Sequence, residues 1–195
     1  MYIKKQTLIT YKILNHSQST LTMRVKIFCG GAFCFDYSKD GYKDEASRDY
    51  RVNILGSTEL LLNHKEHEGV SINSKVTYIG PFYFETEDMK AESIIQCEKA
   101  MIERCDIAIF LLDNASCPGT IAEVIYANFL QKSLQIFYVK YQDNEETESE
   151  LHTPCWYPIQ FCLLTNKSVK IYPCACIEDA ISKIHIFVES LNQQQ

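Results

Sequence analysis

Residues 106–113, DIAIFLLD, are apolar throughout except for the aspartates at the two ends. A strand of a parallel sheet that helices cover on both faces has this composition, whereas a half-exposed strand alternates apolar and polar residues. Other short apolar runs precede and follow it, and longer stretches with apolar residues at helical spacing separate them. The chain is therefore expected to fold into a layered α/β domain.

The predicted strands are residues 24–31, 75–82, 106–113, 134–139 and 168–173. The predicted helices are residues 44–65, interrupted at Gly56, and residues 85–105, 119–132 and 176–192. Strands that alternate with helices imply parallel βαβ units, so we predict a doubly wound, flavodoxin- or Rossmann-like sheet of five parallel strands with helices on both faces. Ligands of such sheets bind beyond the carboxyl ends of the strands.

Length and the pattern of charge predict one domain. The chain has 195 residues, enough for a single domain with a sizeable core, and we place that domain at residues 23–195. Residues 1–35 contain no Asp or Glu, and residues 1–22 are interpreted as an N-terminal extension, with a cleaved transit peptide as the alternative. Residues 140–154 are acidic and predicted to form a solvated loop.

Composition also excludes several classes of partner. The formal net charge of −6 argues against broad binding to nucleic acid or to anionic membranes, both of which need a basic face. No apolar run approaches the roughly 20 residues that span a bilayer. The nine cysteines include no CxxC pair, so we expect neither a metal nor a disulfide framework, and a reducing cytoplasm is the expected compartment.

Thr120 and Glu123 in GTIAE admit two interpretations. As a capping box, the Thr120 hydroxyl accepts from the backbone N–H of the third helical residue and Glu123 reaches back to the helix start. As a catalytic group, Glu123 lies in the first turn of a helix that follows a buried strand, where the helix dipole favours the ionised carboxylate. Such a carboxylate can attack a carbon that develops cationic character, such as the anomeric carbon of a sugar.

Residues 105–127, CDIAIFLLDNASCPGTIAEVIYA, resemble the signature of the nucleoside 2-deoxyribosyltransferase family, which includes nucleotide N-glycosidases. In that family a buried strand ends in Asp, and a short loop leads to the motif GTxxEIGYA. The likeness continues in IIQCEKAMIERCD, with Glu98 eight residues before Asp106, and in the glycine-turn strand KIFCGGAFCF. It spans roughly residues 24–140.

The resemblance implies chemistry at the N-glycosidic bond of a nucleoside or nucleotide, without a cofactor. Glu123 would form a glycosyl-enzyme at C1′, and Glu98 would protonate the departing base and later activate an acceptor base or water. The alternatives are a capping role for Glu123 and a solvated position for Glu98. The resemblance also implies a homo-oligomer with sites near subunit boundaries, where Gln160 would be an amide contributed by the neighbouring subunit.

The residues that the resemblance places around the substrate are Gly30, Gly31, Asp113, Asn114, Ser116, Cys117, Gly119, Thr120, Tyr126 and Gln160. Gly30 and Gly31 would form a turn that lets the sugar approach the backbone, with a plain strand-ending turn as the alternative. Tyr126 could touch the substrate or simply pack. Asp113 and Asn114 could bind ligand hydroxyls or form an Asx turn.

The sequence departs from the family at two positions. Many members carry Asp where this chain has Cys117, and hydrolases of nucleoside monophosphates tend to have a small hydroxyl residue nearby, as Ser116 is here. Losing that carboxylate reduces the repulsion of a phosphorylated ligand, which favours a nucleotide substrate. Ile125 replaces the usual Gly, so hydrolysis is as strongly indicated as transfer.

Two other functions remain open from the sequence. One is a phosphoribohydrolase of the lysine-decarboxylase-like type, whose PGGxGTxxE motif shares GTxxE, although the double glycine is missing here. The other is a nucleotide-sensing module that kept the pocket and lost turnover. Loss of either acid would favour the sensor, and this chain retains both.

Overall fold

The computed structural model describes residues 24–31, 49–62, 69–82, 91–112, 118–139 and 156–193. Its six-stranded sheet has the order β2-β3-β1-β4-β5-β6. The strands are β1 (Val25–Gly31), β2 (Val70–Ser71), β3 (Val76–Tyr78), β4 (Ile107–Leu112), β5 (Ser133–Val139) and β6 (Val169–Cys174). All neighbours are parallel except β2, which runs antiparallel to β3.

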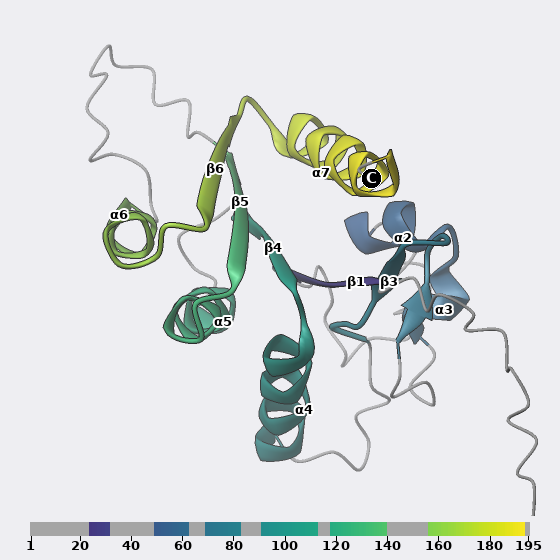
Figure 1. Ribbon diagram of the computed structural model, residues 1–195, viewed down its shortest axis with the longest axis horizontal. Coiled ribbons are helices and arrows are strands. Elements are labelled where there is room, and N and C mark those ends of the chain that lie inside the picture. Colours follow the sequence, from purple (N-terminus) through teal and green to yellow (C-terminus); the bar gives the residue numbers. More distant parts are fainter. Residues whose placement is uncertain are drawn as a thin grey trace, which may run out of the picture.

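Helices cover both faces of the sheet (Figure 1). One face carries α2 (Tyr50–Leu55), α3 (Thr58–Leu62) and α7 (Ile177–Gln193), and the other carries α4 (Ala91–Arg104), α5 (Pro118–Phe129) and α6 (Trp156–Thr165). Each face has its own apolar core: Ile27, Tyr78 and Ile184 belong to the first, and Phe28, Phe110 and Val124 to the second. Successive residues of β1 therefore serve different cores, as the alternation of a strand requires.

The predicted doubly wound α/β fold is confirmed, with two differences. The sheet has six strands rather than five, because Val70 and Ser71 form a short antiparallel edge strand. Helix α6 was not expected, since its sequence WYPIQFCLLT is apolar on nearly all sides and lacks the polar stripe of a surface helix. Where the sequence predicts an interruption at Gly56, that residue ends α2 in the left-handed conformation, with φ 72°.

Some expectations lie outside the described residues. These are the N-terminal extension, residues 1–22, and the acidic loop, residues 140–154. Within the described ranges, no helix is both long enough and apolar enough to cross a membrane.

Candidate active site

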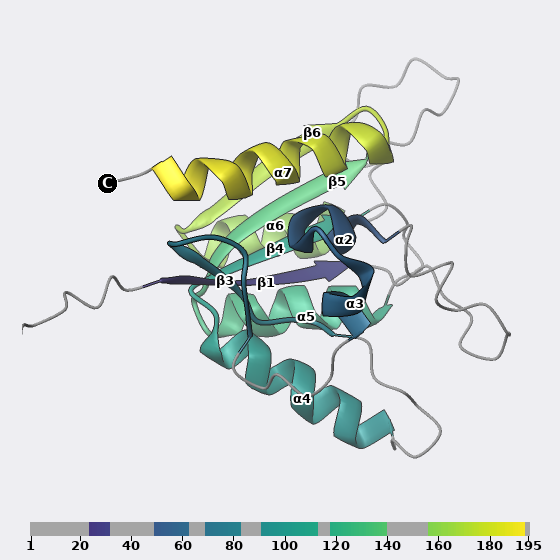
Figure 2. The same cartoon turned by 90° about the vertical axis from the view of Figure 1, so that its right-hand side faces the viewer.

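The strand order reverses between β1 and β4. Counting the parallel strands in chain order, β3-β1-β4-β5-β6 is the flavodoxin-like order 2-1-3-4-5, and its switch point lies where β1 meets β4. Gly30 pairs with Phe110 and Gly31 with Leu111 at the carboxyl ends of these strands. The strands point the same way in Figure 2, which makes this end of the sheet the expected ligand edge.

Helix α5 begins at Pro118, earlier than the capping box requires. Thr120 is the third helical residue and Glu123 the sixth, so Thr120 is not the N-cap and Glu123 lies in the second turn. The capping interpretation is therefore wrong, as is the placement of Glu123 in the first turn. Proline is favoured at the first helical position because its missing N–H is not needed there, and Pro118 was the signal for the true start.

The Glu123 carboxylate lies against the end of β1. A Cβ built on Gly30 would stand 2.9 Å from Glu123 Oε2 and 2.5 Å from two ring carbons of Phe110. Gly30 and Gly31 are both paired residues of β1, as the predicted strand 24–31 has them, and the residues that would continue the glycine turn lie outside the described ranges. In this structure the missing side chain at position 30 makes room for the carboxylate.

Glu98, on α4, interacts electrostatically with Glu123. Burial, and secondly the Glu98 carboxylate, raise the pKa of Glu123 to about 8, while the guanidinium of Arg51 opposes the shift. Burial also raises the pKa of Glu98, again against Arg51. The two acids, 25 positions apart in the chain, are thus near enough for the Glu98 carboxylate to act on the pKa of Glu123.

The start of α2 contributes residues that the sequence did not single out. Arg51 is fully buried and pairs with Asp49, which also caps the helix, at 2.6 Å. Arg51 donates to the carbonyls of Cys29 and Gly31, each at 2.7 Å, and the Tyr50 hydroxyl donates to the carbonyl of Gly30 at 2.8 Å. A charged residue in an amphipathic stretch normally indicates a solvated position, so this burial could not be predicted from the sequence.

Tyr126 turns toward α4 instead of toward β1. Its hydroxyl donates to Glu103 at 2.5 Å, and the Lys99 ammonium lies 5.3 Å from the centre of its ring. These contacts favour the packing interpretation of Tyr126. Helix–helix contact of this kind holds α4, which carries Glu98, against α5, which carries Glu123.

The remaining predicted ligand residues divide into two groups. Thr120 is buried, Gly119 and Gln160 are exposed, and a Cβ built on Gly119 would meet nothing within 4 Å. Gln160 lies on α6, which packs on α5. Outside the described residues lie Asp113, Asn114, Ser116 and Cys117.

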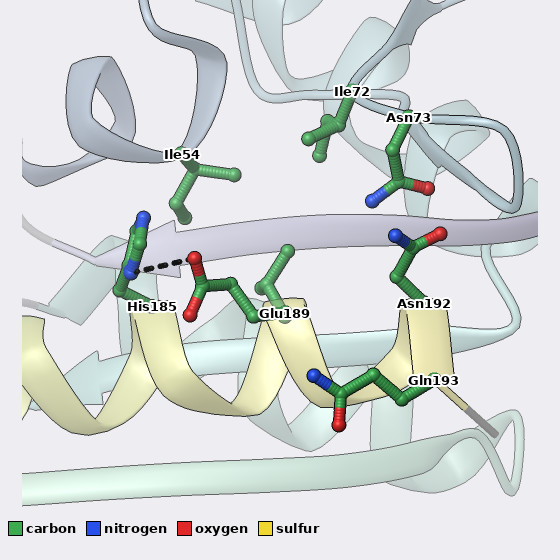
Figure 3. Close-up of a pocket in the computed structure, with 8 residues that line it drawn as sticks. Ile54, Ile72, Asn73, His185, Glu189, Asn192 and Gln193 are labelled. Atoms are coloured by element: carbon green, nitrogen blue, oxygen red, sulfur yellow. Dashed lines mark ion pairs between the residues drawn. The ribbon is translucent and has the colours of Figure 1, made fainter.

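A polar hollow of about 360 Å³ lies on the other face of the sheet, between α2, the turn before β3 and α7. Figure 3 shows Asn73, His185, Glu189 and Asn192 among the residues that line it. The Nδ1 atom of His185 lies 3.8 Å from Oε1 of Glu189. Neither Glu98 nor Glu123 belongs to it. Within the described part of the chain, no three His, Cys, Asp or Glu residues are grouped so as to hold a metal ion.

Comparison of the sequence with models of protein families and with curated proteins finds no match. Solved structures with a similar fold include the CMP N-glycosidase BcmB of Clostridium botulinum, at 12% identity and TM-score 0.47, with 83% of this chain and 98% of that chain covered. A conserved protein of Enterococcus faecalis V583 gives 12% identity, TM-score 0.46 and coverages of 88% and 99%. A probable GTP-binding protein, engB, gives 12% identity, TM-score 0.43 and coverages of 87% and 100%. Similarity this distant carries no information about substrate or reaction.

Proposed function

We propose that this protein cleaves or transfers the N-glycosidic bond of a nucleoside or nucleoside monophosphate. Glu123 is the nucleophile and Glu98 the acid and base. The observation that carries the proposal is the Glu123 carboxyl group, which lies against Gly30 at the carboxyl end of β1, where the strand order reverses, and which interacts electrostatically with Glu98. A retaining displacement at an anomeric carbon uses two carboxyl groups in opposite protonation states.

The protonation of the pair suits this role. Up to about pH 8 the pair holds a proton, since that is where Glu123 titrates. Because the two groups interact, the proton belongs to the pair and can reside on either carboxyl. Positive charge that develops on a sugar beside Glu123 favours the form with the charge on Glu123 and the proton on Glu98.

The reaction then has two halves. In the first, Glu123 forms a bond to C1′ as the C1′–N bond breaks, and the electron pair goes to the base nitrogen, which Glu98 protonates. In the second, the ionised Glu98 takes a proton from water or from an acceptor base, which attacks C1′ and releases Glu123. Water gives hydrolysis, and a base gives transfer.

The test is incubation with a panel of nucleosides and nucleoside 5′-monophosphates, with and without a second base, followed by chromatography of the free base. Glu123→Gln is expected to lower the rate roughly a thousandfold, or about 4 kcal/mol of barrier. The matched control is Glu92→Gln, which changes an exposed glutamate in the first turn of α4. Near-normal turnover by Glu123→Gln would refute the proposal.

Mass spectrometry tests the assignment of roles. A 2′-fluorinated substrate with a good leaving base slows both halves and lets the glycosyl-enzyme accumulate, so peptide mapping should place the added sugar on Glu123. Label on Glu98 would reverse the two roles. Turnover of monophosphates alone with no covalent intermediate would favour the phosphoribohydrolase, and ligand binding without base release would favour the sensor.

A further inference from the structure

We infer that Arg51 is a positioning residue of this site: it fixes the end of β1 on which the Glu123 carboxylate lies, and its charge compensates the pair Glu98 and Glu123. The inference rests on the proposed function, because it assumes that these two carboxyl groups are the reacting pair. It adds a residue that contacts the strand rather than the substrate.

The geometric argument begins at the edge of β1. β3 pairs with β1 only up to the register Ile27↔Tyr78, and the chain that follows adds a bond from the Cys29 N–H to the Gly80 carbonyl. Cys29 and Gly31 are two residues apart, so their carbonyls point to the same edge of the strand. Arg51 donates to both. The guanidinium therefore takes the place of a neighbouring strand where β3 no longer pairs.

The side chain at position 51 needs the shape of arginine. A planar fork can donate in two directions at fixed spacing, which the single ammonium of lysine cannot reproduce. The Tyr50 hydroxyl holds the intervening carbonyl of Gly30. All three carbonyls of residues 29–31 are thus bound from the first turn of α2, directly beneath the carboxylate of Glu123.

The stability of the fold does not explain why a charged arginine is buried at position 51. Arg51 and Asp49 are buried almost completely. Burying an ion pair costs desolvation, and well-packed apolar residues in its place are often as stable or more stable. A buried arginine whose bonds end on the strand below Glu123 is better explained by what its position and charge do for that site.

The groups that interact electrostatically with Glu123 come from two helices. Glu98 faces it from α4, and Arg51 and Tyr50 face it from α2, where Asp49 pairs with Arg51. The Arg51 guanidinium lowers the pKa of both Glu98 and Glu123 against the effect of burial. Without it, two carboxyl groups would share a low-dielectric site with no compensating cation from α2, and both would hold protons to higher pH.

The test compares Asp49→Asn with Asp49→Asn/Arg51→Met, so that no unpaired Asp49 is left and only the guanidinium differs. Carbon-13 NMR of labelled glutamate side chains follows the titration, with the Glu123 signal assigned from Glu123→Gln. We expect the midpoint of Glu123 to move to higher pH in the double variant. The pH profile of base release from nucleoside monophosphates should move in the same direction. Equal midpoints in the two proteins would overturn the inference.

Two further variants separate charge from position. Arg51→Lys keeps the charge and loses the fork, so the midpoint should stay near that of the wild type while kcat falls roughly tenfold. Arg24→Met removes an exposed arginine at the amino end of β1, which bonds Ser71, and should change neither readout. An unchanged kcat in Arg51→Lys would overturn the positioning role, and this variant decides the matter if the double variant does not fold.

The NMR titration requires no substrate. A wild-type protein that releases no base would refute the proposed function while the midpoints still tested the effect of the Arg51 charge. If the wild-type protein releases base, but the titration midpoint of Glu123 is the same with and without the Arg51 guanidinium, only the inference is refuted. The two failures are therefore distinguishable.

Discussion

Glu123 and Gly30 lie close together across two elements of the fold: a Cβ at position 30 of β1 would stand 2.9 Å from the Oε2 atom of Glu123, which comes from the second turn of α5. The identity of a residue on one strand thus decides where the proposed nucleophile can lie. Phe110 closes the same space from β4 and is fully buried, so it has little freedom to yield.

Gly30→Ala should damage both stability and activity. The new methyl group would overlap the Phe110 ring and press on the Glu123 carboxylate, and overpacking of this kind costs about 1–3 kcal/mol. Denaturant unfolding measures the first effect and base release the second. A variant that unfolds like the wild type and turns over normally would show that the contact is not as the structure has it.

Gly119→Ala is the matched glycine change on α5. A Cβ there meets nothing within 4 Å, and Ala is the better helix former, so stability should rise by about 0.4–1 kcal/mol. The same variant examines the predicted ligand contact of Gly119. A lower kcat/KM in a more stable protein would support that contact, and unchanged kinetics would remove Gly119 from the site.

Glu123→Gln should stabilise the unliganded protein, increasingly as pH rises. The pKa of Glu123 is raised from 4.5 to about 8, so the folded state binds the proton more tightly than the unfolded chain does. That contribution is fully present below the unfolded value and is lost as pH rises through the folded value. Between about pH 5 and pH 8 the stability difference, variant minus wild type, should grow by on the order of 3 kcal/mol. Chemical unfolding at several pH values measures it, and a difference independent of pH would contradict the raised pKa.

Glu98→Gln should lower the pKa of Glu123. The Glu98 carboxylate is the second cause of its elevation after burial, so removing that negative charge favours ionisation of Glu123 at lower pH. Carbon-13 NMR of the Glu123 carboxyl gives the midpoint directly. Glu92→Gln is the control, since Glu92 is exposed at the start of the same helix. Equal midpoints in both variants would mean that α4 and α5 do not bring the two acids together.

Tyr126→Phe should affect packing rather than catalysis. The change removes the hydroxyl that donates to Glu103, with a small loss of stability, and keeps the ring beside Lys99. KM and kcat should stay at their wild-type values. A raised KM without loss of stability would return Tyr126 to the ligand site.

The strands were predictable from sequence because each is a short apolar run between polar or glycine boundaries, as in DIAIFLLD. Helix α6 was not predictable, because the apolar residues of WYPIQFCLLT show no periodicity that would distinguish a helix from a strand. Edge strand β2 has only two residues, too few for any alternation to be visible. Its pairing depends on where β3 lies in the fold.

Glu123 and Glu98 could be selected from the sequence, since GTxxE and the upstream acid lie on elements that the sequence places correctly. The role of Gly30 could not be predicted from the sequence, because the carboxyl group that lies where its side chain would be belongs to Glu123, 93 positions later in the chain. The role of Arg51 could not be predicted from the sequence either. Its burial depends on a strand end that β3 leaves uncovered, which is a property of the assembled sheet.

At the start of helix α2, Tyr50 and Arg51 both bond the end of β1, and the N-cap residue Asp49 pairs with Arg51. Successive helical positions diverge by about 100°, so this convergence holds for a single rotational setting of the helix start. A slip of one residue at this helix start would exchange cap, phenol and guanidinium. A relative that keeps this arrangement is therefore expected to carry an Asp-Tyr-Arg triplet at the start of the helix and a glycine pair at the end of the first strand.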